Sequence, residues 1–158
     1  MRKMTSLTVL YFISLCSVFL GGAFFGGQRN RVFFSLAEAV TQPERPLLLV
    51  FFSLDCHVCW EDLIEMKYFI EKNDLPVELI GISSDAPPEL EDFLDKYSFP
   101  YPVVCDKRKE LHRRFKVKLE PFKIIIKNDA ILYADDAYQD FFVRREKVKR
   151  CLLEIASK

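Results

Sequence analysis

Two cysteines separated by two residues are the part of this 158-residue sequence best suited to chemistry: Cys56 and Cys59, in the order Cys-His-Val-Cys. If a helix begins at the first cysteine, the second lies one turn further on, where the two thiols can form and break a disulfide. A cysteine at a helix N-terminus faces free backbone N–H groups and the positive end of the helix dipole, which stabilise its thiolate. The spacing therefore predicts an exposed nucleophile, Cys56, and a buried resolving thiol, Cys59.

The neighbourhood of this pair leaves some interpretations open. His57 adds positive charge beside the thiolate if it is protonated, and is otherwise a solvated side chain of the first helical turn. A permanent disulfide or half of a zinc site is the alternative to a redox pair, but Cys105, Cys151 and His112 supply no second closely spaced pair of ligands. We expect Cys105 to be a small buried residue, Cys151 to face the core, and His112 to lie on the surface.

The elements around the pair are expected to bring it to one edge of a sheet. The apolar run 47–52 predicts a strand buried on both faces, and helical spacing of apolar residues predicts a helix over 57–72. The remaining pattern predicts strands at 76–83, 101–105, 122–126 and 130–133, and helices near 34–41, 87–97, 107–115 and 141–155. This order predicts an α/β domain with a mostly parallel central sheet, flanking helices on both faces and an antiparallel C-terminal hairpin. A functional residue then belongs at the carboxyl end of a central strand.

The N-terminal part differs in composition from the rest. Residues 1–31 contain no acidic side chain, and the 23 residues 5–27 carry no charge at all. A helix of that length covers the roughly 30 Å hydrocarbon core of a bilayer. We expect residues 5–27 to form a membrane anchor, with a signal peptide cleaved near Ala23 and a secreted soluble form as the alternative. The folded domain, 32–158, is expected outside the cytoplasm.

Charge is balanced overall but unevenly distributed. The formal net charge is zero, so no nucleic-acid partner is expected. Residues 55–95 carry a net charge of −10, whereas residues 107–127 carry +7. Solvated helix faces explain part of this segregation, and either region could also steer a partner of opposite sign.

Four further segments accompany the cysteine pair. They are Phe51-Phe52-Ser53-Leu54-Asp55 before the pair, Gly81-Ile82-Ser83-Ser84-Asp85 before a proline-led helix, Phe99-Pro100-Tyr101-Pro102-Val103-Val104, and Glu120-Pro121-Phe122 before the hairpin. With these segments, the chain from about residue 34 onward resembles the thioredoxin-fold thiol-disulfide oxidoreductases. It is most similar to the membrane-anchored, extracytoplasmic TlpA and ResA type within the AhpC/TSA-redoxin superfamily.

The resemblance implies roles for two residues before the hairpin. In such proteins the proline at the position of Pro121 follows a cis peptide bond and packs against the active-site disulfide. The residue before it, here Glu120, offers its backbone to an extended substrate peptide. A carboxylate at this place is unusual, because a negative charge beside the thiolate opposes the stabilising effect of the helix.

The resemblance also draws attention to Asp62, three residues after the second cysteine. A carboxylate often occupies that position in the family, where it could relay a proton to Cys59; the alternative is an exposed helix carboxylate. The chain departs from the family at two positions beside the cysteines, since Asp55 and Val58 stand where tryptophan and proline are usual.

We therefore expect a thiol-disulfide oxidoreductase that exchanges disulfides with partner proteins, as a reductant, for instance in cytochrome c maturation. Its redox centre would be the Cys56–Cys59 disulfide with no other cofactor, and its electrons could come from a donor in the membrane. A thiol peroxidase is one alternative, because residues 81–106 also resemble peroxiredoxins, although Leu49 and Ser53 stand where those proteins have proline and threonine. A non-enzymatic Cu(I) chaperone is another, since two thiolates suit Cu(I).

Overall fold

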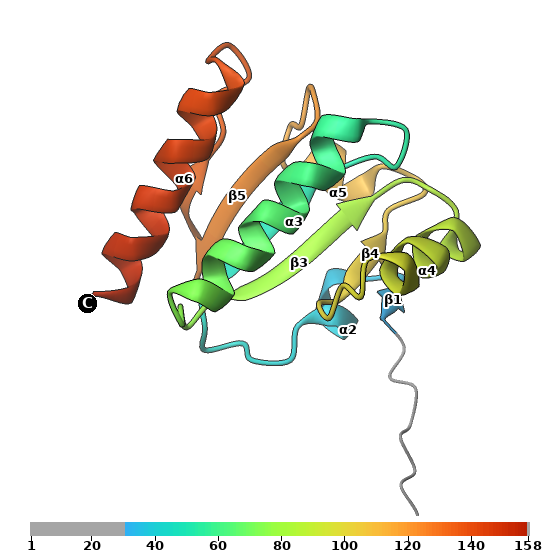
Figure 1. Cartoon of the computed structure of the whole chain (residues 1–158), viewed down its shortest axis with the longest axis horizontal. Helices are drawn as coiled ribbons and strands as arrows, with labels where there is room; N and C mark the ends of the chain where they lie inside the picture. Colours follow the sequence, from blue (N-terminus) through green and yellow to red (C-terminus); the bar gives the residue numbers. More distant parts are fainter. Residues whose placement is uncertain (1–30, 158) are drawn as a thin grey trace, which may run out of the picture.

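Six strands form one mixed sheet in the computed structural model, which describes residues 31–157 (Figure 1). In spatial order they are β1 (Val32–Phe33), β4 (Val103–Cys105), β3 (Glu78–Ser83), β2 (Leu47–Phe51), β5 (Phe122–Lys127) and β6 (Ala130–Ala134). The first four are parallel, β5 runs antiparallel to β2, and β6 antiparallel to β5. The predicted arrangement, mostly parallel with an antiparallel hairpin at one end, is confirmed.

Helices cover both faces of this sheet (Figure 1). They are α2 (Leu36–Ala39), α3 (His57–Lys72), α4 (Pro87–Lys96), α5 (Glu110–Arg114) and α6 (Phe141–Ala156). Side chains alternate along a strand, so Leu48 and Val50 of β2 face a core shared with α3, α4 and α6, whereas Leu49 and Phe51 face a core shared with α2 and α5. All four side chains are fully buried, as predicted for a strand between two layers.

Close packing at the end of β2 depends on a glycine of β3. A Cβ atom on Gly81 would lie 2.9 Å from the Phe52 ring and 3.1 Å from the Val103 side chain. The missing side chain leaves room for the fully buried Phe52 ring directly after β2. A larger residue at position 81 would push against the chain where it leaves the sheet before the cysteine pair.

The sheet differs most from the prediction at β1, which was not predicted, and at the start of β4. β1 has two residues, too few to show any periodicity, and it joins the sheet edge by pairing Val32 with Val103. β4 begins at Val103 rather than at Tyr101. The reason is Pro102, which has no N–H to donate to the strand ladder and contributes only its carbonyl, 3.0 Å from the N–H of Gly81.

The predicted membrane anchor or signal, residues 5–27, lies outside the described part of the chain. Within residues 31–157, no helix is both long enough and apolar enough to cross a bilayer. The boundary between residues 31 and 32 stays a prediction.

Candidate active site

A disulfide joins Cys56 and Cys59 at the start of α3, with the two Cα atoms 5.2 Å apart. Cys56 is the residue that caps the helix, and its carbonyl accepts a hydrogen bond from the N–H of Cys59 at 2.9 Å. Cys59 is fully buried against the core, whereas Cys56 is partly exposed. Cys56 is therefore the sulfur that a partner molecule can reach.

An aspartate from the next strand holds the loop that precedes the pair. The Asp85 carboxylate accepts hydrogen bonds from the N–H of Leu54 at 2.8 Å and from the hydroxyl of Ser83 at 2.6 Å. The loop then closes through the N–H of Cys56, which donates to the carbonyl of Ser53 at 3.2 Å. We did not predict Asp85 as a site residue, but its place at the carboxyl end of β3, next to β2, was a usable signal.

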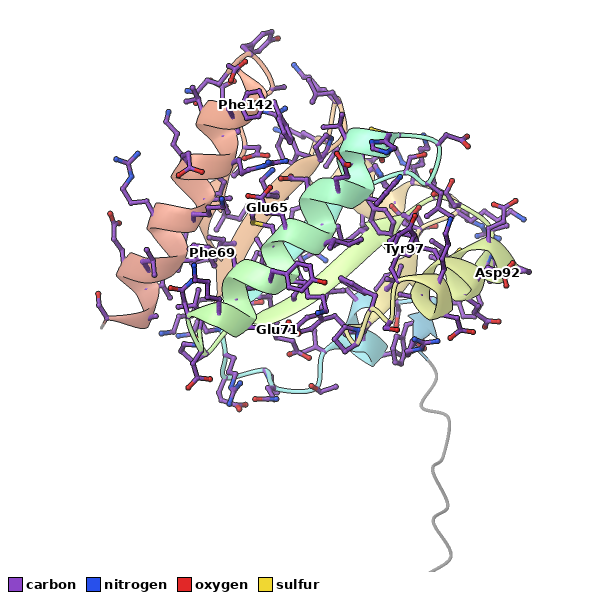
Figure 2. The ribbon with its side chains drawn as sticks, viewed as in Figure 1. Glu65, Phe69, Glu71, Asp92, Tyr97 and Phe142 are labelled. Carbon is purple, nitrogen blue, oxygen red and sulfur yellow. A yellow bond between two sulfur atoms is a disulfide. The ribbon has the colours of Figure 1, made fainter. Side chains whose placement is uncertain are left out.

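The side chain of His57 lies in solvent on the first turn of α3. It is 71% exposed, and its Nδ1 atom lies 3.4 Å from the Glu61 carboxylate one turn further on. Its ring makes an edge-on contact with Trp60, which packs in turn against Tyr97, directly after α4. Figure 2 labels Tyr97 on the side of α4 that faces α3. When protonated, His57 forms an ion pair with Glu61 on the surface of α3.

The peptide bond between Glu120 and Pro121 is cis, as the resemblance implied. β5 begins one residue later, and its first residue, Phe122, pairs with Phe51 at the end of β2. Continuing that antiparallel register places Pro121 and Glu120 beside the loop that leads from β2 to Cys56. The cis bond and the disulfide thus meet at the same edge of the sheet.

The prediction that His112 lies on the surface is wrong. Its side chain is buried, with Nδ1 2.7 Å from the Asp106 carboxylate and Nε2 2.8 Å from the Glu120 carboxylate. Asp106 also accepts hydrogen bonds from the N–H groups of Glu110 and His112, which turns this side of α5 toward the sheet. The imidazole ring then packs edge-on against Phe51.

This network determines the charge next to the cis peptide bond. Burial acts to lower the pKa of His112, but hydrogen bonds and charge from Glu120 and Asp106 outweigh it and raise that pKa above its usual value. Burial acts to raise the pKa of Asp106, but hydrogen bonds from the His112 side chain and from backbone N–H groups lower it overall. Glu120 is therefore paired with a histidine that favours its protonated form, and is not the lone negative charge that we expected.

Asp62 is fully buried, so its interpretation as an exposed helix carboxylate is wrong. One of its oxygens lies 2.5 Å from Nζ of Lys123 on β5, and the other 2.9 Å from Nε of Arg145 on α6. Lys123 is itself fully buried and also lies 3.3 Å from the carboxylate of Asp135. A carboxylate one turn below Cys59 is thus held in place by two cations.

A second arginine of α6 connects this charge network to the cis proline. Nη1 of Arg144 donates a hydrogen bond to the carbonyl of Pro121 at 2.8 Å and lies 3.2 Å from Asp135. Further along α3, Glu65 extends the network at the surface: it lies between α3 and α6 in Figure 2 and pairs with Lys149 at 2.6 Å. We did not predict Lys123 or these partners on α6. A lysine inside the apolar strand Phe-Lys-Ile-Ile-Ile was the one available signal.

Two other cysteines lie in the described part of the chain. Cys105 is buried, as expected, and its thiol donates to the carbonyl of Asp85 at 3.4 Å. Cys151 is half-buried and packs against the core, as expected. Within residues 31–157, no group of three or more His, Cys, Asp or Glu side chains is arranged to hold a metal ion.

A disulfide at the start of the helix that follows the central strand, with a cis proline beside it, defines a thioredoxin-like thiol-disulfide oxidoreductase. The chain belongs to the AhpC/TSA family, whose model matches residues 30–147. No curated protein sequence is significantly similar to it.

Several solved structures share the fold. An uncharacterised thioredoxin-like protein of Porphyromonas gingivalis is 21% identical, with 75% of this chain and 80% of that chain aligned and a TM-score of 0.61. A secreted disulfide oxidoreductase of Mycobacterium tuberculosis, homologous to E. coli DsbE, is 16% identical, with 75% of this chain and 85% of that chain aligned and a TM-score of 0.56. The exposed lipoprotein thioredoxin Etrx1 of Streptococcus pneumoniae is 14% identical, with 71% of this chain and 86% of that chain aligned and a TM-score of 0.56.

Proposed function

We propose that this protein exchanges disulfides with partner proteins outside the cytoplasm, as a reductant, through Cys56 and Cys59. The observation that carries the proposal is the disulfide itself: one sulfur at the exposed start of α3, the other fully buried one turn below. This arrangement gives one thiol access to partners and reserves the other for an intramolecular step.

The exchange proceeds in two displacements. The Cys56 thiolate attacks one sulfur of the partner disulfide, so that a mixed disulfide forms and one partner thiolate leaves. Cys59 then loses its proton and attacks the Cys56 sulfur, which releases the second partner thiolate and restores the Cys56–Cys59 disulfide. The partner gains two electrons and, once both thiolates are protonated, two protons. A dithiol donor, for which a membrane protein is one source, must reduce the pair before the next cycle.

Four neighbouring residues are assigned supporting roles in this proposal. Pro121, which is buried, packs against the disulfide, and Glu120 offers its backbone to the partner's extended chain. Asp62, one turn below Cys59, exchanges a proton with it, while Lys123 keeps the carboxylate in place. His57 adds positive charge beside Cys56 when it is protonated.

A location outside the cytoplasm is supported by two observations. The uncharged stretch 5–27 has the length and composition of an anchor or signal. Two proteins of the same fold are described as secreted and as an exposed lipoprotein. We propose that residues 5–27 hold the domain at the membrane.

Trapping the mixed disulfide tests the proposal. In the full chain, Cys59→Ser should accumulate covalent adducts with partner proteins that disappear on reduction, because the resolving thiol is absent. Cys56→Ser should form none, and Cys105→Ser, a buried cysteine away from the pair, should exchange a model disulfide at nearly the wild-type rate. Adducts are counted on non-reducing gels.

The same variants separate the alternatives. A peroxidase would consume peroxide rapidly and accumulate a sulfenic acid on Cys56 in Cys59→Ser. A copper chaperone would bind one Cu(I) per chain tightly and show little disulfide exchange. Either result, together with an absence of trapped partners, would overturn the exchange proposal.

A further inference from the structure

A groove beside the active site is lined mainly by positive side chains. It has a volume of about 510 Å³ and follows the segment that joins α5 to Pro121. Its four cationic residues, all exposed, are Lys109, Arg113, Lys116 and Lys118. The one acidic residue in its lining is Glu120. The groove is thus lined by part of the segment 107–127, which the sequence showed to be positively charged.

Within residues 31–157, none of these four cations forms an ion pair with a carboxylate. Arg113 donates to the carbonyl of Arg108 at 2.6 Å, and Lys118 lies 3.5 Å from the hydroxyl of Tyr138. Glu120 could neutralise the groove, but its carboxylate is held by His112 at 2.8 Å. The cations therefore leave a positive potential over the groove, which is available to a ligand.

The groove includes Glu120, the residue to which we assign the backbone contact with the partner's chain. Glu120 lines it and is bonded directly to Pro121, which the β2–β5 register places beside the loop before Cys56. His112 lines it as well and contacts Phe51 at the end of β2. A polypeptide whose cysteine reacts at Cys56 and whose chain contacts the Glu120 backbone can therefore extend into this groove.

We propose that the groove binds an acidic segment of the partner protein that lies next to the reacting cysteine. This inference rests on the proposed function and specifies its substrate class. The charge of the groove complements Asp and Glu side chains, and its volume of about 510 Å³ leaves room for the side chains of such residues. Leu119, 36% exposed, gives the aliphatic parts of such a segment an apolar contact. Charges at this position act mainly on the rate of association and weaken with salt.

Matched peptides test the inference. Two disulfide peptides that differ only in the residues beside the cysteine, Asp-Glu in one and Lys-Lys in the other, are reduced by the full chain in non-ionic detergent at low ionic strength, with a dithiol donor that restores the Cys56 and Cys59 thiols and with its direct reaction subtracted. We expect kcat/KM for the acidic peptide to exceed that for the basic peptide about tenfold, and the ratio to fall toward one in high salt. The double variant Lys116→Glu/Lys118→Glu should reverse the preference, a result that misfolding would not produce.

A charge-matched control separates the groove from the general field of the protein. Lys72→Glu/Lys127→Glu changes two exposed residues outside the groove by the same total charge and should leave the ratio of the two peptides unchanged. Equal effects of the two double variants, or a wild-type ratio near one, would overturn the inference. An uncharged disulfide peptide distinguishes failure of this inference from failure of the proposed function. If the wild-type chain reduces neither the charged peptides nor the uncharged one, the exchange activity itself is absent.

Discussion

The Nε2 atom of His112 lies 2.8 Å from the carboxylate of Glu120, the residue that precedes the cis proline. The other ring nitrogen is 2.7 Å from Asp106, so one buried imidazole connects the start of α5 to the loop that borders the disulfide. Because the pKa of His112 is raised by both carboxylates, the charge on Glu120 is balanced locally. This pairing reduces the unfavourable effect that an acidic residue at that position would have on a thiolate at Cys56.

The pairing predicts how the reactivity of Cys56 responds to mutation. His112→Asn leaves Glu120 without its counter-charge, so the pH midpoint for alkylation of Cys56 by iodoacetamide should rise by roughly 0.5–1 unit, equivalent to about 0.7–1.4 kcal/mol. The measurement follows the Cys56 peptide of the reduced chain by mass spectrometry over a pH series.

Two further variants control this experiment. Glu120→Gln alone should change the midpoint little. The variant loses the negative charge of Glu120, but it also loses part of the positive charge of His112, whose pKa the Glu120 carboxylate helps to raise. The double variant His112→Asn/Glu120→Gln should restore the wild-type midpoint. If His112→Asn leaves the midpoint unchanged, Glu120 does not act on Cys56.

The same histidine predicts a dependence of stability on pH. Its pKa is raised in the folded chain above the unfolded value of about 6.5, so its stabilisation is complete below that pH and is lost as pH rises through the folded value. The free energy of unfolding in urea should be about 2 kcal/mol lower for His112→Asn than for the wild type at pH 6. The difference should shrink by pH 9. Asp106, whose pKa is lowered, stays ionised over this range and contributes equally at both values. A difference that grows with pH would contradict the protonated form of His112.

Removal of the buried lysine of β5 should be among the most destabilising changes. Lys123→Met leaves Asp62 and Asp135 as buried carboxylates with reduced compensation and should lower the free energy of unfolding by about 3–5 kcal/mol. Lys149→Met, at a partly exposed ion pair with Glu65, is the matched control and should lower it by less than about 1 kcal/mol. Urea unfolding of the oxidised chain at pH 7 measures both. Equal losses would show that the buried ion pairs of Lys123 contribute no more to stability than the partly exposed pair of Lys149.

Gly81 gives a test of packing behind the active-site loop. Gly81→Ala places a methyl group 2.9 Å from the Phe52 ring, which should lower the free energy of unfolding by about 1–3 kcal/mol. In a Phe52→Leu background the same substitution should be less destabilising, because the smaller side chain leaves room. Additive losses in the double variant would indicate that the strain lies elsewhere.

The fold could be predicted from the sequence because its central elements carry strong local patterns. The apolar run at β2 and the helical spacing of α3 locate both elements, and the Asn128-Asp129 turn marks the C-terminal hairpin. β1 could not be found, because two residues that pair only through the sheet edge leave no pattern in the chain.

The site was less predictable, because its charges are paired across long sequence distances. The buried carboxylate of Asp62 pairs with Lys123 and Arg145, which lie 61 and 83 residues further along the chain. No local sequence pattern connects residues so far apart. His112 stands beside Arg113 and Arg114, which favour a surface position, yet its side chain turns inward toward Asp106 and Glu120. The spacing of two cysteines, by contrast, is local, and it identified the disulfide directly.

The edge strand β1 also determines how the domain can be presented to its surroundings. Because β1 runs parallel to β4, the chain enters β1 from the amino-terminal side of the sheet, and Val32 lies level with Val103 and Gly81. The disulfide lies beyond the other side, at the start of α3, where the parallel strands end. A bead, sensor surface or fusion partner attached ahead of Val32 therefore joins the domain on the side away from the reactive sulfur, which stays open to proteins in solution.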